Sequence, residues 1–331
     1  MIAVKVTGTG SSLPEKVVSN FDIEKLVDTS DEWIRERTGI ENRHISTGET
    51  VSSLAADAAK KALEMAGKSA EEVDLILVAT CSPEMLLPCC ACQVQSAIGA
   101  KNAVAFDLNA ACSGFVFGLG VANAYIQTGM YKNALVIGSE VLSKIVDWTD
   151  RSTCVLFGDG AGAAFIEGTE VTSVEENGEL PGIISISQGS DGAKGMVLAC
   201  HDREVVNPYT TAESKMGYVT MDGQEVYKFA VRQVALCIEN ALKKVGMKVE
   251  DVDHFVLHQA NIRIIEGVAK RLKADYNKFP TNLKNVGNMS SATIPVLLDE
   301  LNRAGAFKKG EKVVLSGFGA GLTYGACVMI W

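Results

Sequence analysis

The stretch Ala62-Leu-Glu-Met-Ala-Gly-Lys-Ser-Ala-Glu-Glu-Val-Asp-Leu-Ile-Leu-Val78 has the pattern of a helix end, a polar turn and a buried strand. A variant of it returns 179 residues later, as Ala241-Leu-Lys-Lys-Val-Gly-Met-Lys-Val-Glu-Asp-Val-Asp-His-Phe-Val-Leu257. Both copies keep a glycine after the helix and Val-Asp before the strand. The match predicts that one structural unit is present twice in the chain.

Other segments share the same offset, which extends the repeat over most of the chain. Pairs at this spacing are Val4 to Ser11 with Ile183 to Ser190, Ala134 to Gly138 with Val313 to Gly317, and Asn109 with Asn288. Near the C-terminus Gly325-Ala-Cys-Val-Met-Ile matches Gly162-Ala-Ala-Phe-Ile-Glu at an offset of 163, so the first copy has 16 extra residues around Trp148 to Asp159. Several identities are only Gly, Ala or Val, which leaves a coincidental origin open. We expect two halves, 1–175 and 176–331.

Helical and strand patterns alternate along the chain and predict an α/β fold. We expect helices at about Ser52 to Ala66 and Ser113 to Thr128, and strands at Leu75 to Val78 and Ala134 to Ile137. With 331 residues, of which 47% are hydrophobic, the chain can bury a large core, and this excludes disorder.

Charge and composition exclude several classes of function. The formal charge of −9 makes nucleic acid an unexpected partner. No apolar stretch approaches the length of a membrane span, and the beginning lacks the pattern of a signal peptide, so we expect a cytoplasmic protein without a membrane partner. The nine cysteines suggest reduced thiols, and the Cys-x-x-Cys of Cys89 to Cys92 lacks the second ligand pair of a metal site. The glycines of Gly8 to Gly10 and Gly158 to Gly162 lack the context of a dinucleotide loop.

Three polar residues follow predicted strands and precede predicted helices: Cys112, His258 and Asn288. A thiol at a helix N-terminus is expected to have a lowered pKa and to act as a nucleophile, although a free cysteine is often simply a buried small side chain. Likewise, Asn288 has the alternative role of a helix cap. The glycine-rich Gly317-Phe-Gly-Ala-Gly321 can bring backbone N–H groups close to a developing oxyanion. If the two halves face each other, these groups converge.

The sequence resembles the β-ketoacyl-acyl carrier protein synthase III family. The resemblance is carried by Ser30-Asp-Glu-Trp-Ile, Arg37-Thr-Gly-Ile, Ala110-Ala-Cys-Ser-Gly-Phe, Asp150-Arg-Ser-Thr-Cys-Val-Leu-Phe-Gly-Asp-Gly-Ala-Gly, His258-Gln-Ala-Asn, Gly287-Asn and Gly317-Phe-Gly-Ala-Gly. It implies a thiolase-like fold of two pseudo-symmetric halves in five α-β-α-β-α layers, a homodimer, and a catalytic triad at Cys112, His258 and Asn288. It also implies an oxyanion hole formed by the backbone N–H groups of Cys112 and Ala320.

The activity implied by the resemblance is the condensation that starts fatty-acid synthesis. Acyl-CoA would acylate Cys112, and malonyl-acyl carrier protein would then lose CO₂ and condense to a 3-oxoacyl-acyl carrier protein, without a permanently bound cofactor. The implied CoA-binding residues are Thr29, Trp33, Arg37, Arg151, Tyr227, Ala260, Asn261 and Phe318. The implied carrier-protein contacts are Lys228, Arg263, Lys270, Arg271 and Lys273, and Leu87 would reach the partner subunit's acyl pocket.

Some alternatives stay open on the sequence. Trp33 or Arg151 taken alone fits a surface aromatic or an ion pair, and the basic residues after His258 fit a solvated helix face. A same-fold acyltransferase or ketide synthase of secondary metabolism would use a different acceptor, and a non-catalytic acyl-CoA-binding protein would form no covalent adduct. Leucine at 87, where some relatives have phenylalanine, suggests longer or branched primers. Residues 191–217 have no pattern that indicates a role.

Overall fold

The computed structural model describes residues 2–171, 181–210 and 217–331, and most of its strands form two sheets. The first sheet has the order β1-β7-β6-β4-β5, and the second has the order β11-β12-β13-β8. The strands of the first are β1 (Ile2–Ser12), β4 (Leu75–Ala79), β5 (Val104–Leu108), β6 (Asn133–Val141) and β7 (Asp159–Glu170). Those of the second are β8 (Gly182–Ser190), β11 (His254–Leu257), β12 (Lys312–Gly319) and β13 (Thr323–Ile330).

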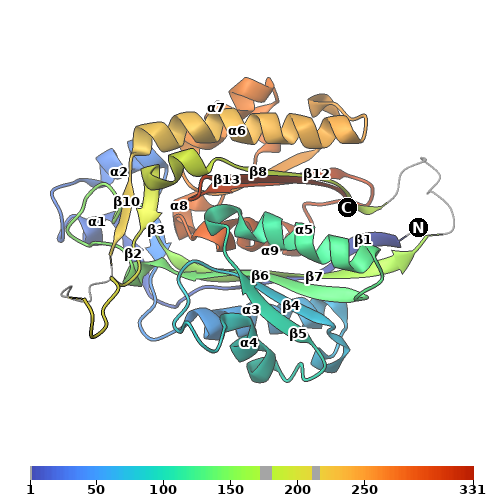
Figure 1. Ribbon diagram of the computed structural model, residues 1–331. Coiled ribbons are helices and arrows are strands. Elements are labelled where there is room, and N and C mark those ends of the chain that lie inside the picture. The colour runs from blue at the N-terminus through green and yellow to red at the C-terminus, as the bar shows by residue number, and fades with distance from the viewer. Residues whose placement is uncertain (1, 172–180, 211–216) are drawn as a thin grey trace.

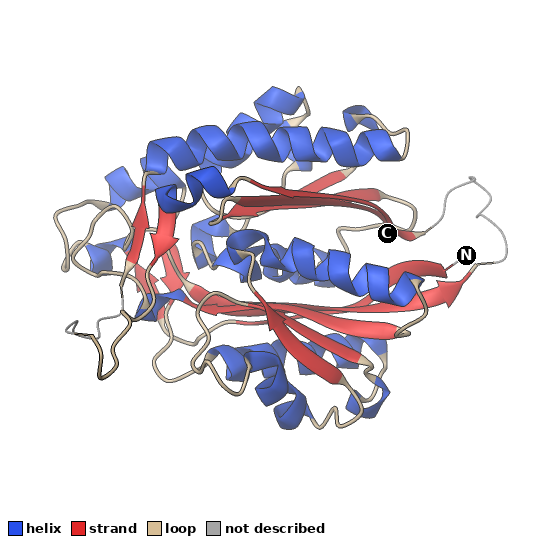
Figure 2. Ribbon diagram, viewed as in Figure 1, coloured by secondary structure: helices blue, strands red, loops and turns tan. Residues whose placement is uncertain are grey.

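Helices separate and cover the two sheets, so that the molecule has five layers (Figures 1 and 2). Helices α3 (Val51–Ala66) and α4 (Cys90–Ile98) lie outside the first sheet, and α6 (Gly223–Lys244) and α7 (Ile262–Leu272) outside the second. Between the sheets lie α5 (Gly114–Gln127) and α9 (Thr293–Arg303), whose apolar side chains share one core with strands of both sheets. The predicted thiolase-like α/β fold is thereby confirmed.

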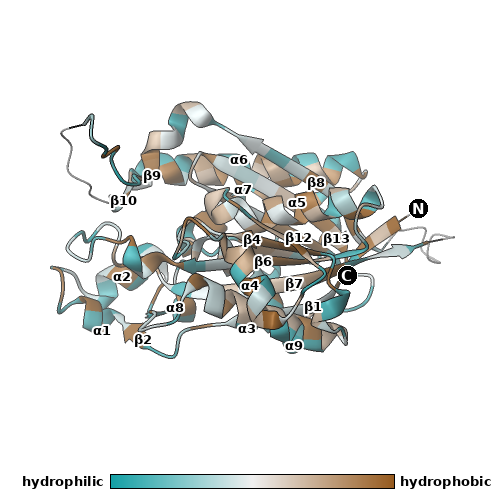
Figure 3. Ribbon diagram, turned by 60° about the horizontal axis from the view of Figure 1, so that its bottom comes forward, coloured by the Kyte–Doolittle hydropathy of each residue, from teal (hydrophilic) through white to brown (hydrophobic). Residues whose placement is uncertain are grey.

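Smaller elements gather mainly at one end of the layers. They are β2 (Val17–Ser19), paired with β3 (Asn42–His44), β9 (Leu198–Cys200), paired with β10 (Val219–Met221), and the helices α1 (Asn20–Ile23), α2 (Asp31–Thr38) and α8 (Leu283–Val286). Figure 3 shows α2 coloured mostly hydrophilic, whereas α5 and β12 are mostly white to brown. In the part of the chain that the structure describes, no helix has both the length and the apolar character needed to cross a membrane.

The two sheets repeat the same arrangement. In the first sheet, β7 pairs antiparallel with both β1 and β6, and β6 pairs parallel with β4. In the second sheet, β13 likewise pairs antiparallel with both β8 and β12, and β12 pairs parallel with β11. The short 3-10 turns Ala111–Ser113 and Ser290–Ala292 also stand at the predicted offset of 179. One element departs from the repeat, because the residues that correspond to β5 form α8 in the second half. The predicted boundary between residues 175 and 176 lies outside the described residues.

Close approach of backbones explains two of the glycines quoted above. A Cβ at Gly8 would lie 2.1 Å from the carbonyl oxygen of Ala62, and one at Gly10 would lie 2.2 Å from that of Ala58. Both carbonyls belong to α3, so these glycines let the helix rest directly on β1. They therefore serve the packing of α3 on β1.

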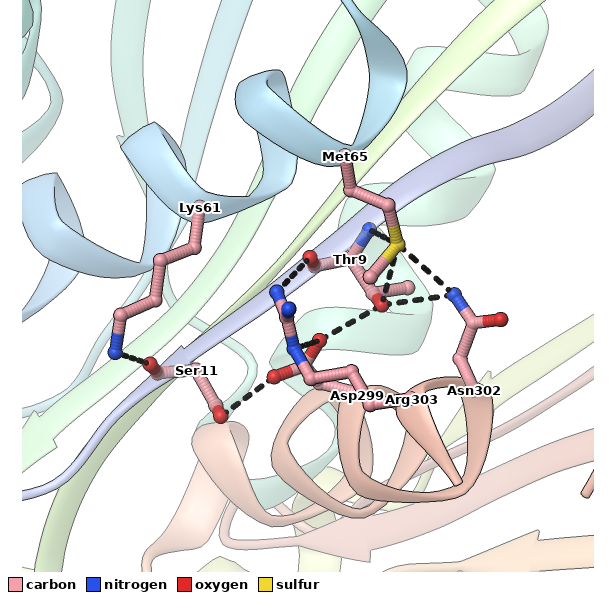
Figure 4. Close-up of polar contacts among 7 residues, drawn as sticks. All are labelled: Thr9, Ser11, Lys61, Met65, Asp299, Asn302 and Arg303. Atoms are coloured by element: carbon pink, nitrogen blue, oxygen red, sulfur yellow. Dashed lines mark hydrogen bonds and ion pairs between the residues drawn. The ribbon is translucent and has the colours of Figure 1, made fainter. Parts of the chain in front are cut away.

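A polar cluster joins the second half to the first (Figure 4). The carboxylate of Asp299, on α9, accepts hydrogen bonds from Thr9 Oγ1 at 2.8 Å and Ser11 Oγ at 2.7 Å, both on β1. Arg303, one turn later, donates to the same carboxylate at 2.8 Å and to the carbonyl oxygen of Thr9 at 3.0 Å. Because Asp299 is buried and well provided with donors, it fixes α9 against β1.

Candidate active site

Cys112, His258 and Asn288 line one cavity of about 920 Å³. Cys112 lies in the 3-10 turn before α5, His258 directly follows β11, and Asn288 precedes the equivalent turn before α9. The cavity thus brings together one candidate from the first half and two from the second, as the repeat predicted.

The backbone around Cys112 is unusual and is repeated in the other half. Ala111 has a φ of 46°, and Ser290, at the equivalent position, has a φ of 48°. Each turn enters a helix directly after this left-handed residue, although the first follows the strand β5 and the second follows the helix α8. The end of β12 lies against the first turn, since a Cβ at Gly319 would stand 2.5 Å from the backbone nitrogen of Cys112. Glycine at 319 is required for this approach.

Burial controls the ionisation of Cys112. The pKa of the thiol is raised to about 12, mainly by burial and also by the negative charge of Glu140, while a hydrogen bond with Ser290 opposes the rise. The sequence-based expectation of a lowered pKa is therefore wrong, because the loss of water outweighs the helix N-terminus. The free protein carries a neutral thiol at neutral pH.

Glu140 is a buried carboxylate that the sequence analysis did not identify. It is fully buried and accepts hydrogen bonds from Thr80 Oγ1 at 3.1 Å, Ser82 Oγ at 2.6 Å and Ser291 Oγ at 2.9 Å. The backbone N–H of Cys81, a residue that lines the cavity, also donates to it at 3.1 Å. These contacts bind the end of β4 to the turn that follows Asn288.

His258 is held as a neutral imidazole. Burial lowers its pKa to about 3, so the ring is uncharged at neutral pH. Its Nδ1 lies 2.6 Å from Oγ1 of Thr293, and its ring meets the ring of Phe318 edge-on, with 5.4 Å between centroids. Its backbone N–H donates to Ser316 of β12 at 2.8 Å.

Asn288 is fixed through its backbone and through its side-chain oxygen. Its N–H donates to the carbonyl of Leu156, and its carbonyl accepts from the N–H of Gly158, each at 3.0 Å. Its Oδ1 accepts from the N–H of Ser290 at 2.9 Å. Because the oxygen is used in this way, the Nδ2 hydrogens remain as donors.

The position of Ala320 is compatible with an oxyanion contact. Ala320 lines the cavity, next to Gly319 and Gly321. Within the described ranges, positive φ at non-glycine residues is confined to Ala111, Lys273 and Ser290, so Ala320 carries its methyl group without strain. A methyl group at position 320 is thus tolerated here.

The implied CoA-binding residues divide into two groups. Arg37, Tyr227, Ala260, Asn261 and Phe318 line the cavity. Trp33 lies outside this lining but beside it, with the guanidinium carbons of Arg37 and Arg151 at 5.4 Å and 5.0 Å from its ring centroid. Arg151 also donates to the carbonyl of Asp28 at 2.9 Å, next to Thr29, whose hydroxyl is buried without a hydrogen-bond partner.

Asn261 connects these residues to α7. Its Oδ1 caps the helix by accepting from the N–H of Arg263 at 2.9 Å, and its Nδ2 donates to the carbonyl of Arg37 at 2.9 Å. The implied carrier-protein residues on and beside this helix are exposed: Arg263, Lys270, Arg271 and Lys273. Lys228 is exposed as well and forms an ion pair with Glu225 at 2.8 Å. Leu87 lies in a different place, on a loop in which it is 87% exposed.

The sequence analysis missed one wall of the cavity. The two strands β9 and β10 contribute Leu198, Ala199, Cys200, Val219 and Met221 to the lining. β9 belongs to the stretch 191–217, whose composition gave no indication of a role. Among the described residues, no group of three or more His, Cys, Asp or Glu side chains is arranged to hold a metal ion.

Comparison with known proteins identifies the family to which this arrangement belongs. The family described as 3-oxoacyl-(acyl-carrier-protein) synthase III matches residues 106–192, and its C-terminal part matches residues 242–331. The β-ketoacyl-(acyl-carrier-protein) synthase III of Clostridium acetobutylicum is 51% identical, over 100% of this chain and 99% of the relative. This chain belongs to the β-ketoacyl-(acyl-carrier-protein) synthase III family. It is accordingly a condensing acyltransferase that initiates fatty-acid synthesis.

Solved structures agree with the assignment to synthase III. The 3-oxoacyl-(acyl-carrier-protein) synthase III of Aquifex aeolicus has a TM-score of 0.89 and 42% identity, covering 99% of this chain and 100% of the other. The priming β-ketosynthase of the R1128 polyketide pathway has a TM-score of 0.90 but 34% identity, covering 99% and 96%. The sequence is thus more similar to these synthases III than to this polyketide enzyme.

Proposed function

We propose that Cys112, His258 and Asn288 catalyse the initiating condensation in two half-reactions within the one cavity. In the first, the Cys112 sulfur attacks the thioester carbon of an acyl-CoA, the bond to the CoA sulfur breaks, and the thiol proton ends on CoA. The N–H groups of Cys112 and Ala320 would stabilise the oxyanion. The observation that carries this proposal is the lining of one cavity by all three side chains.

The second half-reaction uses His258 and Asn288 as hydrogen-bond donors. Malonyl-acyl carrier protein loses CO₂, and the enolate oxygen that forms accepts from His258 Nε2–H and Asn288 Nδ2–H. The enolate carbon attacks the acyl group, the bond to Cys112 breaks, and the Cys112 sulfur takes up a proton from solvent. Neutral donors suit the lowered pKa of His258, which disfavours a proton relay.

The test is condensation with purified protein and defined substrates. Acetyl-CoA and longer or branched acyl-CoA primers are each incubated with malonyl-acyl carrier protein, and 3-oxoacyl-acyl carrier protein and CO₂ are measured. We expect product with at least one primer, and its absence with all of them would refute the proposal. Product from malonyl-CoA but not from malonyl-acyl carrier protein would favour the secondary-metabolic alternative.

We propose that Leu87 of one subunit contributes to the acyl pocket of the other and favours primers larger than acetyl. Support comes from the exposed apolar loop formed by Met85, Leu86 and Leu87, which are 51%, 78% and 87% exposed. In the primer panel, Leu87→Phe is expected to shift the preference towards acetyl-CoA. An unchanged preference would contradict this role.

CoA is proposed to run along the cavity past Tyr227, Ala260, Asn261 and Phe318, with its nucleotide near Thr29, Trp33, Arg37 and Arg151. The aromatic ring and the two guanidinium groups suit an adenine and its phosphates. Substitution of Trp33 by alanine is expected to raise the KM for acyl-CoA and to leave the KM for malonyl-acyl carrier protein unchanged.

The acidic carrier protein is proposed to dock on Arg263, Lys270, Arg271 and Lys273, with Lys228 nearby. Arg263, Lys270 and Arg271 stand at a spacing that places them on one face of α7, and Arg263 also lines the cavity. The double variant Lys270→Glu, Arg271→Glu is expected to raise the KM for malonyl-acyl carrier protein without slowing acylation by acyl-CoA. An equal loss in both half-reactions would contradict docking at this patch.

We further propose that the protein is a cytoplasmic homodimer, and that each chain consists of two halves that meet between residues 175 and 176. The enzyme is proposed to work without a bound cofactor or metal and without a nucleic-acid or membrane partner. The proposed division is supported by the end of β7 at Glu170 and the beginning of β8 at Gly182. The dimer is supported by β5, which is an edge strand of its sheet, and by the exposed apolar loop of Met85, Leu86 and Leu87, which precedes α4.

A further inference from the structure

We propose that Thr293 is a positioning residue that sets the tautomer of His258, by donating its hydroxyl proton to Nδ1 so that Nε2 carries the hydrogen. The inference rests on the proposed function of His258 as a donor to the enolate.

The contact that carries the inference is short and dry. Nδ1 of His258 and Oγ1 of Thr293 are 2.6 Å apart, and the two residues are 3% and 0% exposed. Water therefore does not compete for either atom, and each protonation pattern must be satisfied by protein groups. The N–H of Gln259 also donates to Oγ1, at 3.3 Å.

The hydroxyl proton has two possible acceptors, His258 Nδ1 at 2.6 Å and the carbonyl of Ser290 at 3.1 Å. The carbonyl of Ser290 already accepts from the backbone N–H of Thr293. Among the residues that the structure describes, Nδ1 has no other hydrogen-bond partner, and it is nearer to Oγ1 than the carbonyl is. Donation to Nδ1 thus satisfies both acceptors with the groups present.

The opposite pattern would be unsuitable for the proposed chemistry. If Nδ1 carried the hydrogen and donated to Thr293, Nε2 would hold a lone pair. A lone pair directed at an enolate oxygen is repulsive, whereas an N–H stabilises it. Burial keeps the ring neutral by lowering its pKa to about 3, so the ring carries a single N–H hydrogen and its location decides the activity.

The turn Ser290–Ala292 and the residue after it would then orient both hydrogen-bond donors, Asn288 Nδ2 and His258 Nε2. Ser290 donates its N–H to Asn288 Oδ1, which leaves Nδ2 for the substrate, and Thr293 does the same for His258 three residues later. At the offset of 179 the counterpart of Thr293 is Gly114, which has no side chain. The second half is therefore specialised at this position.

Two variants separate this role from a structural one. Thr293→Val keeps the size but loses the hydroxyl, and Thr293→Ser keeps the hydroxyl. We expect Thr293→Val to lower the condensation kcat about 10- to 100-fold, while acylation of Cys112 by acyl-CoA changes less than about threefold. Thr293→Ser should recover most of the kcat. Equal losses in both half-reactions, or no rescue by serine, would overturn the proposal.

The tautomer of His258 is observed directly by ¹⁵N NMR of protein labelled at histidine. The spectrum is simple because the chain has only four histidines. His258→Asn assigns the resonance. We expect hydrogen on Nε2 in the native protein and in Thr293→Ser, and a mixture or the other tautomer in Thr293→Val. Hydrogen on Nδ1 in the native protein, or an unchanged tautomer in Thr293→Val, refutes the inference. Because this spectrum requires no turnover, a failure of the proposed condensation would be distinguishable from a failure of the role of Thr293.

Discussion

Cys112 illustrates how two environmental effects of opposite sign combine at one residue. A helix N-terminus typically stabilises a nearby anion by about 0.3–1 kcal/mol. The rise of the thiol pKa from 9.0 to about 12 corresponds to roughly 4 kcal/mol against the anion. Burial therefore prevails, and the nucleophile is a thiol until the substrate arrives.

The hydrogen bond between Ser290 and Cys112 provides a test of this balance. Ser290→Ala removes a contact that lowers the pKa, so the thiol pKa should rise and less thiolate should exist at any pH below it. At pH 8 we expect alkylation of Cys112 by iodoacetamide to slow about fivefold, as loss of about 1 kcal/mol implies. The rate is followed by peptide mass so that the other cysteines do not interfere. Unchanged or faster alkylation, in a variant that melts like the native protein, would contradict the assignment.

The approach of β12 to the turn of Cys112 matters at the scale of elements. Gly319→Ala would place a Cβ 2.5 Å from the nitrogen of Cys112, and because both parts are backbone, a strand or a turn must move. We expect a loss of about 1–3 kcal/mol in the free energy of unfolding and at least a tenfold loss of acylation rate. Ala320→Gly is the matched control, expected to change the acylation rate by less than threefold. Urea denaturation and the acylation rate measure both, and a fully active Gly319→Ala would contradict the close approach.

The helices and strands that local patterns predict are found in the structure, because periodicity and turn glycines are properties of short segments. The predicted helix at about Ser52 to Ala66 is α3, and the predicted strand at Leu75 to Val78 is β4. The 179-residue offset carries the same information to the second half. Short segments do not indicate that α8 stands where the second sheet would have a fifth strand. They also do not indicate that β9 and β10 form a wall of the cavity.

The site was predictable in its residues but less so in its chemistry. Cys112 and His258 follow strands, as the sequence predicts, whereas the strand expected before Asn288 is the helix α8 in the structure. The raised pKa of Cys112 and the partners of Glu140 depend on contacts between residues far apart in the chain, such as Ser291 and Glu140, 151 positions apart. Burial and long-range hydrogen bonds are properties of the assembled fold. Sequence patterns alone therefore predicted the wrong direction for the shift of the Cys112 thiol pKa.

At the scale of the whole molecule, one edge of the first sheet is formed by the short strand β5. β5 is the edge strand next to β4, and the loop of Met85, Leu86 and Leu87 exposes apolar side chains beside the first sheet. Pairing with a second copy would cover both. We expect sedimentation equilibrium to give twice the chain mass of 35.2 kDa, and Leu86→Asp with Leu87→Asp to shift it towards one chain. A native protein that stays at one chain mass at micromolar concentration would contradict the dimer.

The central claim is that Cys112 carries the acyl group, whereas His258 and Asn288 are needed only for the condensation. Intact-mass analysis after incubation with an acyl-CoA tests this claim most directly. The native protein, His258→Ala and Asn288→Ala should each gain one acyl group, while Cys112→Ala gains none. On addition of malonyl-acyl carrier protein, the native adduct should disappear rapidly as 3-oxoacyl product forms, and the adducts of the other two variants should persist. An acyl group that remains in Cys112→Ala, or rapid condensation by His258→Ala and Asn288→Ala, would contradict the account.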